Sequence, residues 1–438
     1  MVKRSSLSAI VLLASGIIGA CSIVDREAPA TDAAGAPVLA IVGVTVIDGS
    51  GAEPLPDATV VVRDGRIESV GPSAEIEVPA EAEVLEAAGK YLVPGLINAH
   101  GHVGATLGLD GGHYSRENVL RHLQLYANYG VTTVVSLGGD EPAGVEVRDE
   151  QDTPSLDRAR LFVAGAVVTG DTPGAALEMV DGNAAMGADF IKIRVDDNLG
   201  ATSKMPPAVY RAVIERAHEL GLPVAAHLFY LEDAHALLDQ DVDFIVHSVR
   251  DRDVDDGLAA RLVEADVCYS PTLTREVSTF VYESEPEFFS DDFFLASAEP
   301  AVLEALRAPE SMARYRESES AQRYKEALAQ AQRNLGALSD AGVTIAMGTD
   351  TGPPARFQGY FEHMELALMA ESGMSPMEIL VASTGDAARC TGLEGVGTIE
   401  AGNWADLILL SDDPLAGVEN LRAIESVWIA GNRVPSVS

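Results

Sequence analysis

The chain has 438 residues, and this length suits one large barrel of about 250 residues together with a smaller domain. Its composition, with 47% hydrophobic residues, is that of a globular protein and excludes a disordered or fibrous chain. The 67 acidic residues outnumber the 30 basic ones and give a net charge of -37, so binding to nucleic acid is disfavoured because phosphate would be repelled.

The N-terminus has the layout of a bacterial signal peptide. Lys3 and Arg4 precede a mostly apolar run over 7–18, which is too short for a membrane span. The following residues, IGAC over 18–21, resemble a lipobox, in which the cysteine becomes the lipidated first residue of the mature protein; the alternative is a plain secretory signal. Lipidated Cys21 would tether the protein to a membrane surface in the cell envelope, on the periplasmic or outer-membrane side.

Short β-branched runs occupy both ends of the mature chain. VLAIVGVTVID (38–48) is followed by further strand-like runs and a turn at Asp64-Gly65, and GNWADLILL (402–410) has the same texture near the C-terminus. Both ends therefore predict one small β-sandwich domain. The predicted division is a signal peptide over 1–20, lipidated Cys21 and a tether over 21–37, the β-domain over 38–93 and 395–438, and a barrel over 94–394.

Between these ends, short apolar strands alternate with helical periods, such as the amphipathic stretch from Pro207 to Leu220. This alternation predicts an α/β fold, a (β/α)₈ TIM barrel. The predicted strands are Gly95–His102, Val131–Ser136, Arg160–Ala164, Phe190–Arg194, Pro223–His227, Phe244–His247, Val267–Ser270 and Val343–Gly348.

The connection over 271–341 is unusually long for a barrel. Its first half is acidic and aromatic, and its second half, from Ser311 to Leu338, is expected to be helical. It is either a lid over the active face or a packing or dimer element. If it is a dimer element, the protein would form a homo-oligomer, and the sequence leaves both alternatives open. We expect Cys268 and Cys390 to be buried free thiols, although one disulfide between them is an alternative.

Polar side chains follow several predicted strands, where barrel catalysts lie. His100 and His102 are two residues apart, so both imidazoles point the same way from an extended strand. His227, His247 and Asp350 each end a later apolar run. A single such residue would be a satisfied core group, but the set predicts a site for zinc or a similar divalent ion.

Lys192 lies inside a predicted strand, in FIKI (190–193). Burial favours the free amine, which can react with carbon dioxide to give a carbamate that bridges two metals. The alternative is a side chain that points outward between helices. Of the two, we favour the interpretation that Lys192 is a metal ligand in the form of N6-carboxylysine.

These motifs resemble the amidohydrolase superfamily, in its imidazolonepropionase-like or prolyl-dipeptidase-like branch. The matching stretches are PGLINAHGH (94–102), FIKI (190–193), the two strand-end histidines, MGTD (347–350) and GVGTIEAGNWADLILL (395–410). The resemblance implies two divalent metals, usually zinc. His100, His102 and Asp350 would bind one, His227 and His247 the other, and carboxylated Lys192 and a hydroxide would bridge them. Asp350 would be the general base and acid.

The chain departs from its relatives at two positions. Relatives often carry a carbonyl-polarising histidine after strand three, where this chain has Asp171, and a tyrosine two residues beyond the strand-five histidine, where it has Phe229. Tyr230 is a candidate catalytic residue in its place. Further candidates for substrate binding are Arg275, Arg356, Asp171 and His113.

The leading hypothesis is a metal-dependent amidohydrolase that cleaves a carbon–nitrogen bond in a small-molecule amide, such as a dipeptide or an N-acyl amino acid. One alternative is a mononuclear deaminase or cyclic-amide hydrolase in which Lys192 is idle. Another is an envelope-tethered binding lipoprotein without activity.

Overall fold

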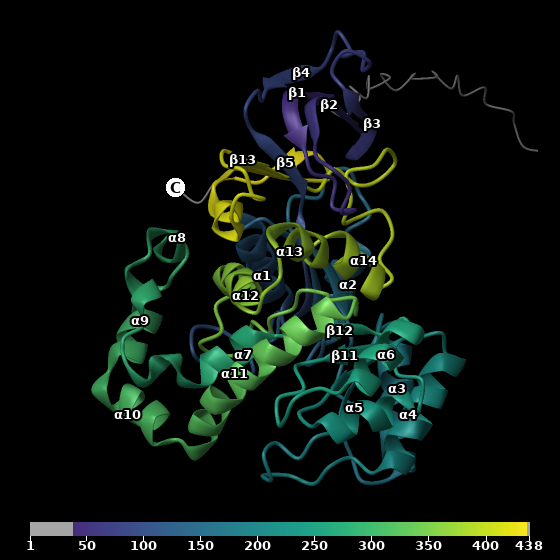
Figure 1. Ribbon diagram of the computed structural model, residues 1–438, viewed down its shortest axis with the longest axis vertical. Coiled ribbons are helices and arrows are strands. Elements are labelled where there is room, and N and C mark those ends of the chain that lie inside the picture. The colour runs from purple at the N-terminus through teal and green to yellow at the C-terminus, as the bar shows by residue number, and fades with distance from the viewer. Residues whose placement is uncertain (1–37, 436–438) are drawn as a thin grey trace, which may run out of the picture. The chain divides into compact units, whose positions relative to one another are not determined.

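The computed structural model describes residues 38–435, in which two parallel sheets with their helices adjoin one larger mixed sheet (Figure 1). The strands are β1 (Leu39–Val46), β2 (Leu55–Arg63), β3 (Arg66–Pro72), β4 (Glu83–Glu86), β5 (Tyr91–Pro94), β6 (Leu96–Gly101), β7 (Val131–Ser136), β8 (Arg160–Val163), β9 (Ile191–Arg194), β10 (Val224–His227), β11 (Phe244–Val246), β12 (Cys268–Ser270), β13 (Leu407–Leu410), β14 (Ile424–Ile429) and β15 (Asn432–Arg433).

Fourteen labelled α-helices and three 3₁₀ turns connect these strands. The helices are α1 (Arg116–Asn128), α2 (Pro142–Asp149), α3 (Pro173–Met186), α4 (Pro207–Glu219), α5 (Leu231–Leu238), α6 (Asp256–Glu264), α7 (Leu273–Phe280), α8 (Asp292–Leu295), α9 (Pro300–Arg307), α10 (Pro309–Glu317), α11 (Glu319–Asp340), α12 (Tyr360–Glu371), α13 (Pro376–Ala382) and α14 (Gly385–Cys390). The turns are η1 (Val281–Glu283), η2 (Glu287–Ser290) and η3 (Val418–Arg422). Within residues 38–435, none of the helices has the length and apolar character needed to cross a membrane.

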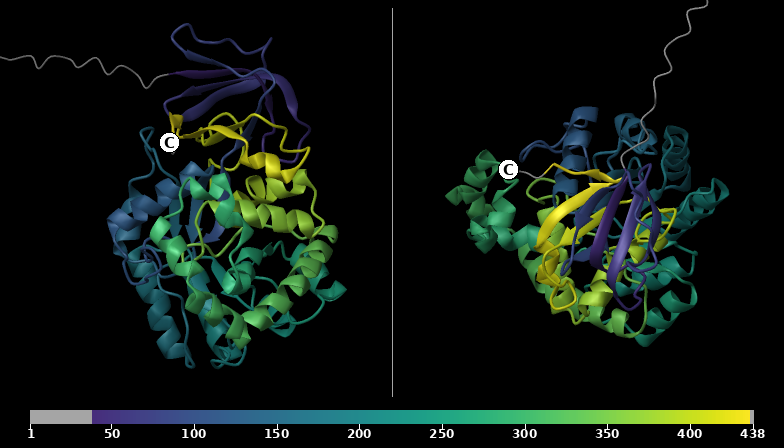
Figure 2. Two further views of the ribbon diagram at one scale, coloured as in Figure 1. Left: turned by 90° about the vertical axis from the view of Figure 1, so that its left-hand side faces the viewer. Right: turned by 90° about the horizontal axis from the view of Figure 1, so that it is seen from above.

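The larger sheet has eight strands in the order β15-β14-β13-β5-β1-β2-β3, with β4 paired to β1. Strands from both ends of the chain thus share one sheet, as the purple and yellow ribbons of Figures 1 and 2 show. Along β13, Leu407 and Leu409 join the sheet's own core, whereas Ile408 and Leu410 join the core of the α/β part. Alternate side chains of a strand point to opposite faces, so β13 connects two hydrophobic cores.

The α/β part contains two parallel sheets, β6-β7-β8 and β12-β11-β10-β9, whose strands alternate with helices. This confirms the predicted α/β fold. The amphipathic prediction is also confirmed by α4, which buries Val209, Val213 and Ala217 on one face and ends before Gly221, where φ is 75°.

The eighth predicted strand, Val343–Gly348, is not a regular strand in the structure. Its contacts with the neighbouring strands are few: Ile345 forms one isolated bridge with Tyr269, which has two backbone hydrogen bonds to this segment, and Ala99 N donates to Met347 O. Shortly afterwards the chain turns at Asp350, whose φ is 57°. Isolated pairings replace a continuous ladder there.

The long connection between β12 and residue 343 is mostly helical and contains α7 to α11. The helical prediction for its second half is confirmed by α10 and α11. The aromatic side chains of its first half, including Phe288 and Phe294, pack with Tyr129 and Phe361 in a separate hydrophobic cluster. Packing is thus one role of this segment.

Cys268 in β12 and Cys390 at the end of α14 form a disulfide. The expectation of free thiols is therefore wrong. The fold brings the two Cα atoms to 5.7 Å although 122 residues separate the cysteines, and this Cα separation is typical of disulfides. Sequence spacing gave no indication of this proximity.

Candidate active site

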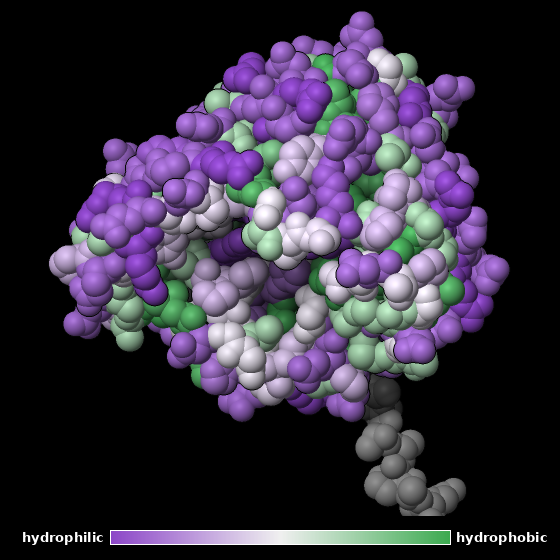
Figure 3. Space-filling model, turned by 90° about the horizontal axis from the view of Figure 1, so that it is seen from below, coloured by the Kyte–Doolittle hydropathy of each residue, from purple (hydrophilic) through white to green (hydrophobic). Residues whose placement is uncertain are grey.

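Four of the six predicted metal ligands, the histidines, lie at the carboxyl ends of parallel strands or just beyond them, whereas Lys192 lies inside β9 and Asp350 follows the irregular segment 343–348. His100 is in β6, Lys192 in β9 and His227 at the end of β10, and His247 follows β11 by one residue. Because β6 follows directly from β5, these strand ends point away from the eight-stranded sheet. Figure 3 shows this face, with a hollow near its centre that contains hydrophilic side chains.

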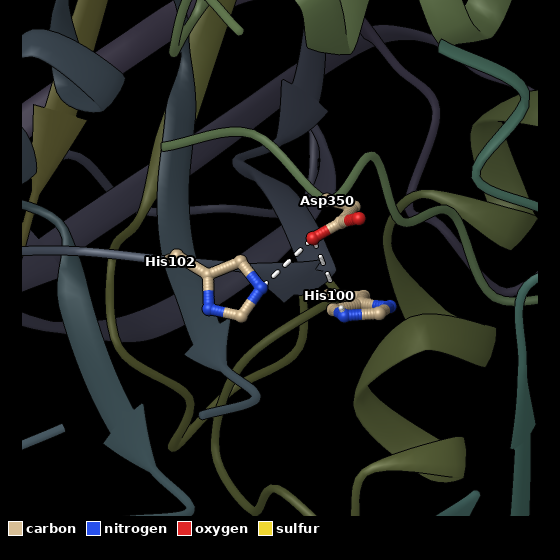
Figure 4. Close-up of side chains that lie close together, drawn as sticks. All are labelled: His100, His102 and Asp350. Atoms are coloured by element: carbon tan, nitrogen blue, oxygen red, sulfur yellow. Dashed lines mark hydrogen bonds and ion pairs between the residues drawn. The ribbon is translucent and has the colours of Figure 1, made fainter. Parts of the chain in front are cut away.

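His100, His102 and Asp350 form the most compact group of these ligands (Figure 4). Their ligand atoms all lie within 4.8 Å of one another. His102 Nε2 is 2.8 Å from Asp350 Oδ1, and His100 Nε2 is 3.9 Å from the same oxygen. Two imidazoles and one carboxylate in this arrangement can hold a divalent cation.

The other ligands adjoin this group through His100. The ring centroids of His100 and His247 are 4.7 Å apart, and those of His247 and His227 are 4.0 Å apart. Lys192 Nζ is 3.4 Å from His100 Nε2. The structure therefore brings all six residues into one cluster, with Lys192 only 3% exposed and His100 only 1%.

Hydrogen bonds outside the cluster orient three of the histidines. His102 Nδ1 is 2.8 Å from Gly138 O, His227 Nε2 is 3.0 Å from Asp196 Oδ2, and His247 Nδ1 is 2.7 Å from Thr272 Oγ1. Each bond occupies one ring nitrogen and leaves the opposite one available. Such outer partners are characteristic of metal-binding histidines. Sequence reasoning missed Asp196 and Thr272; the only signal for Asp196 is its position two residues beyond β9.

The charges of the cluster also fit a cation. Burial lowers the pKa of Lys192 to about 7, although Asp350 and Asp196 raise it in part. Burial likewise lowers the pKa of His227 to about 4 and places the pKa values of His100 and His247 well below their usual range. The imidazoles of His100, His227 and His247 are therefore neutral near pH 7, as metal ligands must be. In addition, His100 Nδ1 is buried without a hydrogen-bond partner in the described chain.

Asp350 remains ionised in this setting. Burial alone would raise its pKa, but the Arg356 guanidinium and the nearby histidines place the pKa well below its usual value. Arg356 Nη1 donates to Asp350 Oδ2 at 2.5 Å. Arg356, predicted as a substrate-binding residue, is thus engaged with the cluster itself.

A buried carboxylate behind the cluster fixes the backbone that carries its ligands. Glu362 accepts hydrogen bonds from Asn98, Thr349 and Thr351 at 2.6–2.7 Å. The two threonines flank Asp350, and Asn98 Oδ1 accepts a hydrogen bond from the backbone N–H of His100. Burial raises the pKa of Glu362, and the hydrogen bonds from the two threonines partly oppose that rise.

The remaining predicted residues have partners outside the cluster or are exposed. Tyr230 donates its hydroxyl to Asp197 Oδ1 at 2.8 Å, and Arg275 is buried with Glu276 and Tyr324 as partners. Asp171 and His113 are both exposed. Cys21 lies outside the described residues.

Comparison with known proteins places this site in a family. Residues 91–434 match the amidohydrolase family. A solved structure of a protein assigned as a prolidase, from Bifidobacterium longum, is 26% identical with a TM-score of 0.73, covering 91% of this chain and 95% of that chain. A Xaa-Pro dipeptidase with methionine bound in its active site has the same TM-score at 20% identity, covering 91% of this chain and 100% of that chain.

A curated relative is similar over nearly the same extent. The imidazolonepropionase of Streptomyces griseus is 24% identical over 405 residues, which cover 86% of this chain and 92% of the relative. The family match includes all six cluster residues, since they lie between positions 100 and 350. The chain therefore belongs to the amidohydrolase family and is a hydrolase that acts on carbon–nitrogen bonds.

Proposed function

We propose that this protein is a metal-dependent hydrolase that cleaves the amide bond of a dipeptide or an N-acyl amino acid. One observation carries the proposal: four histidines, one lysine and one aspartate converge in one cluster, with three of the histidines oriented by outer hydrogen bonds. The B. longum prolidase assignment and the Xaa-Pro dipeptidase support a peptide-like substrate.

The donor set fits two divalent metals. His100, His102 and Asp350 would hold one, and His227 and His247 the other; imidazole nitrogens and a carboxylate suit zinc. When bound, such metals supply Lewis acidity that polarises a carbonyl and makes water nucleophilic near neutral pH. A metal would also satisfy the ring nitrogens that the outer hydrogen bonds leave free.

Lys192 would link the two metal positions as N6-carboxylysine. Its buried amine has a pKa of about 7, so a substantial fraction is unprotonated at neutral pH. The free amine adds to carbon dioxide, forming an N–C bond and releasing one proton, and the product is an anionic carbamate with two ligand oxygens. The 3.4 Å approach of Nζ to His100 Nε2 supports this position.

The chain's own acid–base groups are Asp350 and Tyr230. Asp350 would accept the proton of the attacking water and deliver it to the leaving nitrogen, while Arg356 holds its second oxygen in place. Burial and Asp197 raise the pKa of Tyr230 to about 12, so its hydroxyl keeps its proton. Asp197 accepts that proton in the structure, and the hydroxyl would have to turn from Asp197 to the substrate carbonyl to replace the absent histidine near Asp171.

The test combines metal analysis with a substrate panel. We expect the purified protein to contain two metal equivalents per chain and to hydrolyse members of a dipeptide and N-acyl amino acid panel, with activity lost on chelation and regained with zinc. Complete inertness toward the panel at full metal loading would refute the peptide-like substrate, and no metal binding at all would refute the mechanism.

A mononuclear deaminase or cyclic-amide hydrolase is the second candidate. It is favoured by the compactness of His100, His102 and Asp350. Within residues 38–435 they are the one set of three or more His, Cys, Asp or Glu side chains whose ligand atoms all lie within 4.8 Å of one another. The imidazolonepropionase relative is consistent with it. One metal equivalent, together with turnover of cyclic amides but not of open-chain ones, would select this alternative.

We further propose that β6 to β12 and residues 343–348 close into a (β/α)₈ barrel over 94–394. Three isolated parallel bridges support closure. Val168 pairs with Ile193 between the two sheets, Tyr269 pairs with Ile345, and Gly101 pairs with Thr351. The flanking segments 38–93 and 395–438 would then form the smaller domain.

Export and lipidation at Cys21 are proposed from the N-terminal motif. The disulfide between Cys268 and Cys390 supports an oxidising compartment such as the periplasm, because disulfides seldom persist in the cytosol. We expect Cys21→Ala to move the protein from the membrane fraction to the soluble periplasmic fraction. Unchanged fractionation, together with an unmodified Cys21 by mass spectrometry, would refute the anchor.

A further inference from the structure

The long connection between β12 and residue 343 builds a cleft beside the candidate active site. Helices α9, α10 and α11, at the lower left of Figure 1, enclose it together with the end of α7 and the loop that follows Asp350. Its volume is about 480 Å³, within the range of small-molecule sites in proteins. The segment thus has a second structural role besides the packing of its aromatic residues.

Hydrogen bonds link the inner wall of this cleft to the cluster through two intervening residues. Tyr324 lines it and accepts a hydrogen bond from Arg275 Nη2 at 3.0 Å, and Arg275 lies over the tyrosine ring at 3.9 Å. The Tyr324 hydroxyl is 3.4 Å from Asn198 Oδ1, and the Asn198 N–H donates to Asp196, the outer partner of His227. Two residues, Asn198 and Asp196, thus link the lining residue Tyr324 to His227 of the cluster.

The lining of the cleft selects against cationic ligands. Leu306, Tyr315 and Ala355 provide apolar surface, and Ser320 provides a hydroxyl. None of the lining residues is acidic, although 67 of the 438 residues of the chain are Asp or Glu, and the one charged lining residue is Arg314. Within residues 38–435 Arg314 forms no ion pair; its guanidinium is only 3.4 Å from Ser311 Oγ.

We infer that this cleft binds the arm of the substrate remote from the scissile amide, and that this arm is apolar and ends in a carboxylate. The apolar wall would bury the arm, while Arg314 at the exposed rim would pair with the carboxylate. This inference rests on the proposed amidohydrolase function and specifies its substrate class.

The test compares two amides that differ only in the end of the arm. One carries a 4-carboxyphenylpropyl arm and the other its carboxamide, and each is made with the arm on the acyl side or on the amine side; N-acetyl-leucine serves as a substrate without the arm. We expect wild-type kcat/KM to favour the carboxylate by about tenfold in one orientation, as suits a charged hydrogen bond at a partly exposed rim.

Arg314→Gln should reduce this preference to near unity, whereas Arg316→Gln, on the same helix but outside the cleft, should retain it. Calorimetry on chelator-treated protein provides a second measurement, since the Kd of the carboxylate compound should rise about tenfold in Arg314→Gln alone. Equal wild-type kcat/KM for the two compounds, or an undiminished preference in Arg314→Gln, would overturn the inference. Turnover of N-acetyl-leucine in that case would leave the proposed function intact, whereas failure of every amide with normal calorimetric binding would refute the function and not the cleft.

Discussion

Replacement of Lys192 by methionine should affect the metal-free and metal-loaded proteins in opposite directions. Lys192 is 3% exposed, and its amine approaches His100 among neutral imidazoles. Without metal, this residue is a buried amine that the fold disfavours in its charged form. With metal, it is the proposed bridging ligand. A methionine of similar length removes the amine and retains the apolar stem.

The magnitude follows from the shift in the lysine pKa. Its usual value of 10.5 falls to about 7 in the folded protein, chiefly through burial. Between these two pH values the unfolded chain binds a proton that the folded chain does not, so the free energy of unfolding rises with pH across this window. At pH 8 the buried lysine costs about 3 kcal/mol, at 1.36 kcal/mol for each pKa unit. The cost is largest below pH 7 and disappears above pH 10.5.

Urea unfolding at pH 7, 8 and 9 with chelator present measures the first effect. Metal-free Lys192→Met should be more stable than metal-free wild type by about 3 kcal/mol at pH 8, with a difference that shrinks as pH rises. Lys325→Met, on the exposed face of α11, should change stability by less than about 1 kcal/mol.

Metal analysis and kinetics measure the second effect. Zinc-loaded Lys192→Met should contain at most one metal equivalent and lose at least about 100-fold in kcat/KM, since even outer partners of metal ligands contribute up to that factor. Two bound metals with full activity would refute the bridging role. A metal-free variant that is less stable than wild type at every pH would refute the reasoning from burial.

Three further predictions concern residues outside the cluster. Asp406→Ala should lower the free energy of unfolding by about 3–5 kcal/mol, because Arg160, 2% exposed and 2.7 Å from the carboxylate, would lose its charged partner; an unchanged urea midpoint would contradict this. Thr272→Val should weaken metal affinity about 10- to 100-fold in chelator competition, because the orienting hydrogen bond to His247 would be lost; unchanged affinity would show that this bond is dispensable. Cys390→Ser should cost about 2–5 kcal/mol of stability in oxidising buffer and little in reducing buffer, and an equal cost in both would argue against the disulfide.

The clustering of the histidines could be predicted because their positions depend on local rules. His100 and His102 are two residues apart on an extended strand, so their side chains point the same way without any knowledge of the rest of the chain. His227 and His247 each close an apolar run, and parallel strands of alternating α/β chains place their carboxyl ends on one face. The order of residue types along the chain was sufficient for these four.

The residues that orient the ligands could not be predicted in the same way. The sequence around Gly138 and Thr272 has no pattern that distinguishes these two residues. Each contacts a histidine only because the fold brings the end of another strand close to it. The partner of Arg356 was not predicted either: this residue was expected to bind substrate, but its guanidinium donates a hydrogen bond to Asp350. Hydrogen bonds of this kind depend on distances of a few tenths of an ångström, which periodicity does not specify.

The sequence by itself thus determined the α/β fold, the family motifs and the positions of the candidate metal ligands along the chain. Only the tertiary structure decided which ring nitrogens are occupied, that Cys268 pairs with Cys390 across 122 residues, and that the connection before residue 343 encloses a cleft without acidic residues. The physical reason is the range of the interactions. Strand and helix periodicity arises from neighbours in the chain, whereas these contacts join segments that meet only after the strands have packed.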